Sequence, residues 1–172
     1  MIRTENVSKK MKDFARVKKL YETSFPPEER MPLKYILYGG FSSLDFAAFY
    51  DNEIFCGFFM LMTQGDITHI LYLAVEEAFR NRGYGAEALK IVREMKPSNR
   101  LVVDIETPDA ASDNYEQRIR RKAFYLRNGY RESDIAYWWN GVAYEILVRG
   151  ADVTEEEFEG FWKAARSEQR KA

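Results

Sequence analysis

Residues 80–86 read RNRGYGA and lie between the apolar run His69–Val75 (HILYLAV) and the segment Glu87–Val92 (EALKIV). This order predicts a strand, a turn that contains two glycines, and a helix. Glycine lets the backbone turn its N–H groups toward a ligand without a clash at Cβ, and the following helix places the positive end of its dipole at the same point. The stretch therefore predicts a site for a pyrophosphate group, with Arg80 and Arg82 adding positive charge.

Two other glycine motifs compete for this turn. A P-loop needs a lysine and then a serine or threonine directly after its last glycine, whereas this sequence continues with alanine and glutamate, so a P-loop is excluded. The dinucleotide fingerprint G-x-G-x-x-A fits Gly83, Gly85 and Ala88, and Asp104 follows about 20 residues later. In that fingerprint the strand leads almost directly into the first glycine, but here the mostly polar segment Glu76–Arg82 intervenes. A dinucleotide-linked oxidoreductase stays as an alternative function.

A third interpretation comes from a resemblance to a known family. The order Leu73-Ala74-Val75 and then Arg80-x-x-Gly83-x-Gly85 is similar to the acyl-CoA pyrophosphate signature of the GNAT superfamily of N-acetyltransferases. A second element follows in register, because Tyr125-x-x-x-Gly129-Tyr130 resembles the family's Tyr-x-x-x-Gly-aromatic element. The order of predicted strands and helices fits the same family over about residues 1–150.

Periodicity and turn signals predict a mixed α/β (α+β) fold with one domain. Helices are predicted at residues 9–25, 28–37, 114–128 and 155–166, and one opens at the glycine turn; strands are predicted at residues 1–6, 44–50, 54–63, 67–75, 101–106, 134–139 and 142–149. The resemblance implies a mixed, mostly antiparallel sheet of about seven strands flanked by helices. Residues 1–150 would form the acyltransferase domain, and residues 151–172 a C-terminal helical extension of it.

Composition limits the classes of partner. The 172 residues carry a formal net charge of −1, which gives no overall basic field for a nucleic acid or an acidic membrane surface. One cysteine and no apolar run of membrane length lead us to expect a cytoplasmic protein, either a monomer or a homodimer. Cys56 lies in an apolar strand with no adjacent base, which favours a buried, inert thiol. One histidine and one cysteine predict no metal site.

The resemblance implies a set of groups that bind acetyl-CoA. In the family, the fourth and fifth strands run parallel but separate at a bulge in the fourth strand, and the pantetheine arm of the co-substrate inserts between them. The backbone of Leu73, Ala74 and Val75 would bind that arm. The pyrophosphate would lie on Arg80, Asn81, Arg82, Gly83, Tyr84, Gly85 and Ala86. Arg118 and Arg121 replace the Asn and Ala that the family often has, and are candidates for binding CoA phosphates, although a basic run is usually a solvated helix face.

Transfer to an ammonium group requires a base, and departure of CoA thiolate requires an acid. His69 matches the position of the base in the family, and an imidazole titrates at about pH 6.5, which suits a base at neutral pH. Its structural alternative is a hydrogen-bonded strand histidine. Glu106, at the end of a predicted strand, is the rival base or a ligand for a cationic acceptor. Tyr125 is the candidate acid, since a phenol keeps its proton at neutral pH; the alternative is core packing.

Together these features predict an N-acyltransferase that moves an acetyl group from acetyl-CoA to a primary amine by direct transfer in a ternary complex. A non-catalytic acyl-CoA sensor or scaffold is the second possibility. The acceptor would bind near the first helices and the last hairpin, and a small amine, a peptide N-terminus, a lysine and an antibiotic all fit. Its candidate residues are Phe25, Glu29, Arg30, Tyr35 and Trp139.

Overall fold

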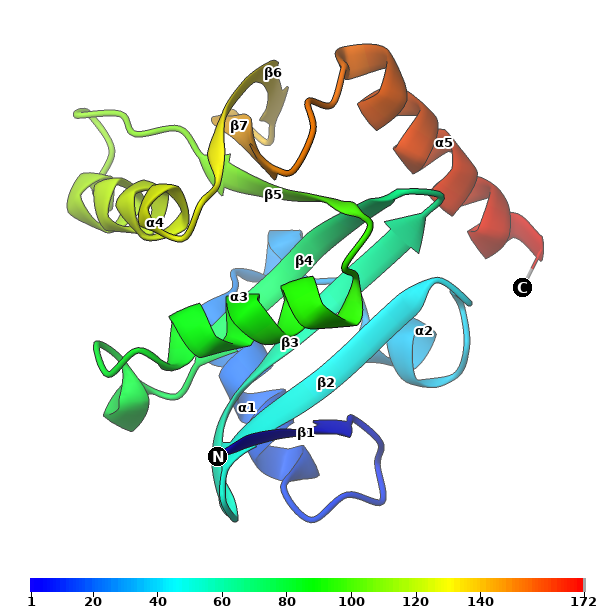
Figure 1. Ribbon diagram of the computed structural model, residues 1–172, viewed down its shortest axis with the longest axis vertical. Coiled ribbons are helices and arrows are strands. Elements are labelled where there is room, and N and C mark those ends of the chain that lie inside the picture. Colours follow the sequence, from blue (N-terminus) through cyan, green and yellow to red (C-terminus); the bar gives the residue numbers. More distant parts are fainter. Residues whose placement is uncertain (172) are drawn as a thin grey trace.

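The computed structural model describes residues 1–171, with side chains up to residue 169, and shows one sheet covered by helices on both faces (Figure 1). Within these residues, seven strands follow the order β1-β2-β3-β4-β5-β7-β6. The strands are β1 (Ile2–Asn6), β2 (Leu44–Asp51), β3 (Ile54–Gln64), β4 (Ile67–Val75), β5 (Arg100–Glu106), β6 (Arg131–Trp139) and β7 (Val142–Arg149). The helices are α1 (Phe14–Ser24), α2 (Leu33–Leu37), α3 (Tyr84–Met95), α4 (Tyr115–Arg127) and α5 (Glu155–Lys171), with 3-10 turns η1 (Pro27–Glu29) and η2 (Glu77–Phe79). The predicted mixed fold with a C-terminal helix is confirmed.

The sheet contains one parallel pair within the described residues, β4 with β5, and every other neighbouring pair is antiparallel. A dinucleotide-binding sheet is mostly parallel. The topology therefore does not support the G-x-G-x-x-A interpretation of the glycine turn.

The helices divide between the two faces of the sheet. On one face, α3 and α4 bury Ala88, Leu89 and Tyr125 against the sheet. On the other face, α1 packs over β2–β4, and α5 packs Phe158 and Phe161 over the part formed by β5, β7 and β6. Figure 1 shows α3 in front of the sheet, α1 behind it, and α5 along the side away from α4.

Four predicted boundaries were wrong. The last helix, expected to end near residue 166, continues to Lys171. The first helix begins at Phe14 and not near residue 9, because the chain first makes a turn in which Met11 is buried and its N–H bonds to the carbonyl oxygen of Ser8. The predicted helix at 28–37 is divided into η1 and α2, since proline at position 32 has no N–H for a continuous helix. The strand expected to start at residue 134 starts at Arg131 and is irregular between Glu132 and Ala136.

Candidate functional site

The glycine turn forms the N-terminus of α3. Gly83 has φ +87°, a left-handed conformation that favours glycine, and Tyr84 begins the helix directly after it. The first N–H groups of a helix have no acceptor within it, so those of residues 84–86 are free to bind an anion. Arg80 stabilises the turn from the strand side, because its Nε donates to the carbonyl oxygen of Val75 at 3.1 Å.

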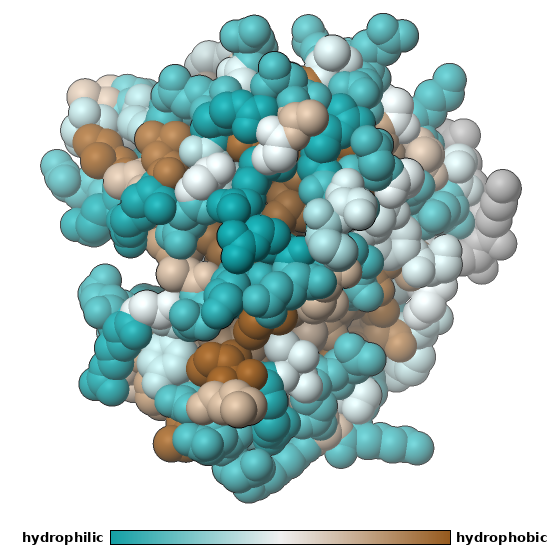
Figure 2. Space-filling view, viewed as in Figure 1, coloured by the Kyte–Doolittle hydropathy of each residue, from teal (hydrophilic) through white to brown (hydrophobic). Residues whose placement is uncertain are grey.

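The other side chains of this turn have different positions. A Cβ at Gly85 would lie 3.1 Å from the Phe124 ring, so this glycine allows α3 to approach α4 closely. The Tyr84 hydroxyl donates to the Asp51 carboxylate at 2.7 Å, so the Tyr84 side chain takes part in holding the fold together. Arg82 lies 5.9 Å over the ring of Phe79. Figure 2 shows a notch in the surface between α4 and the segment that precedes α3.

The expected bulge in the fourth strand is present. Met60 pairs with Tyr72 and Leu61 pairs with Ile70, so Leu71 is the extra residue in β4. The parallel pairing of β4 with β5 ends at His69 and Val102. Leu73–Val75 lie beyond that point and pair with β3 on their other edge. The backbone of β4 that faces the gap is thus available to an inserted ligand, as in strand addition.

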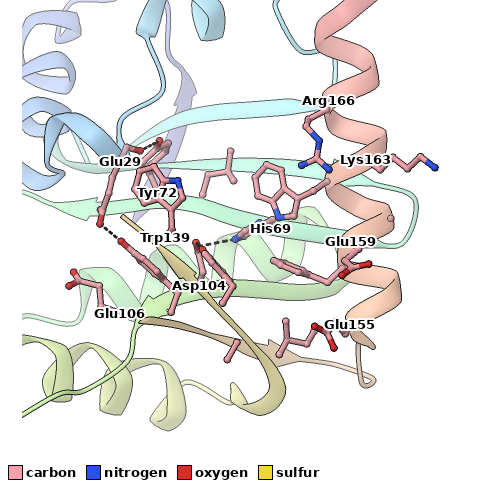
Figure 3. A pocket seen from close by; sticks show the side chains of 18 of the residues that line it. Glu29, His69, Tyr72, Asp104, Glu106, Trp139, Glu155, Glu159, Lys163 and Arg166 are labelled. Carbon is pink, nitrogen blue, oxygen red and sulfur yellow. Dashed lines mark hydrogen bonds and ion pairs between the residues drawn. The ribbon is translucent and has the colours of Figure 1, made fainter. Parts of the chain in front are cut away.

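A cavity of about 970 Å³ lies on the opposite face of the sheet from α3 (Figure 3). It is bounded by η1, β4, the end of β5, the β6–β7 hairpin and α5. Its walls are largely aromatic, and its charged side chains are mostly acidic. The aromatic residues are Phe25, Tyr72, Tyr137, Trp139, Tyr144, Phe158 and Trp162, and the charged residues are Glu29, Asp104, Glu106, Arg121, Glu155, Glu156, Glu159, Lys163 and Arg166.

His69 lines this cavity and is only 1% exposed. Its Nε2 lies 3.0 Å from Oδ1 of Asp104. Rings of α5 cover it, with the centroids of Phe158, Phe161 and Trp162 at 5.9, 5.8 and 5.3 Å. The sequence did not reveal this contact, because α5 lies about 90 residues further along the chain and nothing local indicates what it packs against.

Glu106 also lines the cavity, but two arginines bind it. Arg118 lies 2.7 Å from one carboxylate oxygen and Arg121 lies 3.7 Å from the other. Arg118 also donates to the side chain of Asn114 and to the carbonyl oxygen of Thr107. The guanidinium of Arg118 thus holds Glu106 and the start of α4, and its contact with a CoA phosphate stays a prediction. Arg121 faces the cavity.

Glu29 is an acidic group of the cavity whose pKa is raised. Its Oε1 accepts a 2.6 Å hydrogen bond from the Tyr144 hydroxyl, and its carbonyl oxygen accepts one from Tyr72. Burial raises the pKa of the Glu29 carboxyl, the Tyr144 hydrogen bond opposes that rise, and the charge of Glu106 adds to it. An ammonium group bound here would relieve the unfavourable burial of this carboxylate.

Tyr125 lies on the other face, in α4, and is 6% exposed. Its ring packs against Phe124 and Tyr130. Among the described residues its hydroxyl has no hydrogen-bond partner. Burial raises the pKa of Tyr125 to about 12, with Arg121 opposing the rise and Asp104 adding to it. The hydroxyl therefore keeps its proton at neutral pH and can donate it.

The structure separates the predicted acceptor residues into two groups. Phe25, Glu29 and Trp139 line the cavity, whereas Arg30 and Tyr35 do not. The sequence also missed Asp104 as a partner of His69, together with Tyr137, Tyr144 and the cavity face of α5. Within the described residues, no three His, Cys, Asp or Glu side chains are grouped so as to hold a metal ion. None of the helices in residues 1–171 combines the length and apolar character needed to cross a membrane.

The solved structures that are similar to this chain share its fold. An acetyltransferase assigned to the GNAT family from Bacteroides thetaiotaomicron is 21% identical, with a TM-score of 0.74 and 92% of each chain covered. A GNAT acetyltransferase from Elizabethkingia anophelis, with acetyl-CoA bound, is 18% identical, with a TM-score of 0.60 and coverage of 87% of this chain and 98% of that one. The ribosomal-protein-S18-alanine N-acetyltransferase of Escherichia coli is 14% identical, with a TM-score of 0.62 and coverage of 91% and 97%.

Comparison with family models is more direct. No curated protein matches the sequence. A model described as an acetyltransferase (GNAT) domain matches residues 43–132, which include the bulged β4, the glycine turn and Tyr125. This match covers more than half of the 172 residues, and the chain therefore belongs to the GNAT family of acetyltransferases.

Proposed function

We propose that this protein transfers an acetyl group from acetyl-CoA directly to the primary amine of a cationic acceptor. One observation carries the proposal: the only parallel strand pair in residues 1–171 separates after His69 and Val102, between an anion-binding helix N-terminus on one face and an acidic cavity on the other. A ligand inserted in that gap reaches both. The acetyl-CoA-bound neighbour supports the identity of the co-substrate.

The residue roles follow from these positions. The pyrophosphate binds the N–H groups at the start of α3, and the pantetheine arm extends along the edge of Leu73–Val75 that faces away from β3. The acceptor enters from the cavity on the opposite face. Its ammonium group is attracted by Glu29 and by aromatic walls, which favour cations.

The nitrogen of the acceptor loses two protons in the reaction. The ammonium group first loses one to solvent through His69, and the neutral amine then forms the C–N bond at the thioester carbonyl carbon as the C–S bond breaks, while His69 takes the second proton. Tyr125 donates its proton to the leaving thiolate. Cys56 is fully buried, and burial raises the pKa of its thiol, which supports direct transfer rather than an acyl-cysteine intermediate.

An amine panel tests the proposal. Release of free CoA thiol is followed with acetyl-CoA and a series of primary amines, against a reaction without amine. Amine-dependent release, with the acetylated amine identified by mass spectrometry, is the expected result. Tight acetyl-CoA binding with no release for any amine would instead favour the sensor or scaffold function.

We expect His69→Gln to lower kcat about 10²- to 10⁴-fold, the range of general base catalysis, because it removes the imidazole that takes the proton from the amine. Glu106→Gln should keep kcat within a few-fold of wild type, since Arg118 and Arg121 already bind this carboxylate. A kcat that is kept in His69→Gln and lost in Glu106→Gln would assign the base to Glu106.

Glu29→Gln should raise the acceptor KM about tenfold or more, because it removes a half-buried charge that the ammonium group would pair with, and a charged hydrogen bond is worth about 1.5–3 kcal/mol. The KM for acetyl-CoA should not change. Glu94→Gln, an exposed glutamate on α3, is the matched control and should behave as wild type. An unchanged acceptor KM in Glu29→Gln would exclude Glu29 from acceptor binding.

A further inference from the structure

His69 belongs to a chain of three hydrogen-bonded side chains. Its Nε2 lies 3.0 Å from Oδ1 of Asp104, and Oδ2 of Asp104 accepts a 2.5 Å hydrogen bond from the Tyr137 hydroxyl. The three residues come from β4, β5 and β6 and meet at the cavity wall. Figure 3 shows the link between His69 and Asp104.

The charge on Asp104 fixes the position of one hydrogen on the histidine ring. Burial alone would raise the pKa of Asp104, but His69 and the Tyr137 hydroxyl together hold it below its ordinary value, so the group is a carboxylate. A carboxylate can only accept hydrogen bonds. Nε2 of a neutral His69 must therefore carry the hydrogen, which leaves the lone pair on Nδ1.

Nδ1 is the second informative atom of this ring. It is buried and has no hydrogen-bond partner among the groups that the structure describes. Buried polar atoms almost always have a partner, so a buried acceptor at the wall of a large cavity indicates that a ligand supplies the missing donor. A primary amine has the required N–H.

The surroundings of the ring favour a single arrangement. Phe158, Phe161 and Trp162 of α5 cover the ring. None of these side chains carries a hydrogen-bond acceptor that would stabilise a hydrogen on Nδ1 in place of Nε2. Beyond these rings, the charged and titratable side chains that line the same cavity are Glu29, Tyr72, Glu106, Arg121, Tyr144, Glu155, Glu156, Glu159, Lys163 and Arg166. Among the described residues, Asp104 is the group that bonds to the imidazole.

We propose that Asp104 and Tyr137 are positioning residues that fix the Nε2–H tautomer of His69 and so make Nδ1 the atom that takes the proton from the acceptor amine. In the step, the amine nitrogen forms its bond to the acetyl carbon and its proton passes to Nδ1. Asp104 stays ionised and stabilises the imidazolium, as in an Asp–His pair of a hydrolase triad. His69 then returns the proton to solvent. This inference rests on the proposed acetyltransferase function, but its first test needs no turnover.

The presence of one histidine in the sequence makes that test direct. Long-range 1H–15N correlation spectra of the 15N-labelled protein report which ring nitrogen carries the hydrogen, with no ambiguity of assignment. The wild-type protein at alkaline pH should show the Nε2–H tautomer. Asp104→Asn should show a mixture of tautomers, because a carboxamide can either accept from Nε2 or donate to it. Asp45→Asn, which removes a strand carboxylate that is paired with Lys96 far from the cavity, should keep the wild-type spectrum.

Kinetics then separate positioning from stability. We expect kcat of Asp104→Asn to fall about 10²- to 10⁴-fold, the range of general base catalysis, with the KM for acetyl-CoA unchanged. Tyr137→Phe keeps the ring and should give a smaller loss in the same direction. If Asp104→Asn does not fold, Tyr137→Phe carries both measurements.

Two results would overturn the inference: an Nδ1–H tautomer in the wild-type protein, or a tautomer and a kcat that are the same in Asp104→Asn and in the wild type. A protein with the expected spectra that releases no CoA with any amine would refute the proposed function, and with it the catalytic part of the inference, while leaving the positioning of the ring established.

Discussion

Replacing Gly83 with valine should weaken acetyl-CoA binding about tenfold to a hundredfold. Gly83 has φ +87° immediately before α3, and a β-branched residue is strongly disfavoured there, at a cost of about 1–2 kcal/mol. The turn would have to change its conformation, and the N–H groups at the start of the helix would no longer converge on the pyrophosphate. Each hydrogen bond to a charged group is worth about 1.5–3 kcal/mol, so the loss of even one has this effect.

Isothermal titration with acetyl-CoA measures this change, and the chain offers a matched control. Gly65, in the turn between β3 and β4, also has a positive φ, and a Cβ added there would meet no described atom within 4 Å. Gly65→Val should cause similar backbone strain and a similar decrease in Tm, but should keep its affinity. Gly85→Val is less informative, because its side chain would press on Phe124 and disturb the packing of α3 against α4. Unchanged affinity in a folded Gly83→Val protein would place the phosphate site elsewhere.

Local signals were sufficient to predict most of the fold. The glycine turn identified the start of α3, because a positive φ next to a helix N-terminus depends on the residues of that segment alone. The hairpin turn at Asn140–Gly141 between β6 and β7 could be predicted in the same way from its own two residues. The bulge at Leu71 was expected only from the family resemblance. It is a feature of how the β4 backbone pairs with β3, and the apolar residues around it give no sign of it.

The site was less predictable, because most of it depends on contacts between distant segments. The sequence placed His69 on a strand, but Asp104, Tyr137 and the rings of α5 reach it only after the sheet and the last helix have formed. Arg118 shows the same limit. The basic run around Arg118 suggested an anion site. In the structure Arg118 lies one helical turn from Asn114, donates to its side chain and forms an ion pair with Glu106.

Tyr125→Phe should slow the chemical step about 10²- to 10⁴-fold, the range of general acid catalysis, with little change in the KM for acetyl-CoA. The substitution removes the hydroxyl and keeps the ring that packs against Phe124 and Tyr130. Since burial raises the pKa of Tyr125 to about 12, the wild-type hydroxyl is protonated throughout the neutral range and can protonate the departing thiolate. No hydrogen bond within the described part of the protein competes for that proton.

The alternatives to this role predict different results. If Tyr125 only packs, Tyr125→Phe should keep wild-type kcat, and any effect should be confined to Tm. If it binds the acceptor, the acceptor KM should rise with kcat unchanged. Tyr130→Phe is the matched control, because Tyr130 is equally buried in the same cluster and its hydroxyl is enclosed by protein. The comparison requires single-turnover kinetics, in which product release does not limit the rate. Wild-type rates in Tyr125→Phe under those conditions would transfer the acid role to water or to the substrate itself.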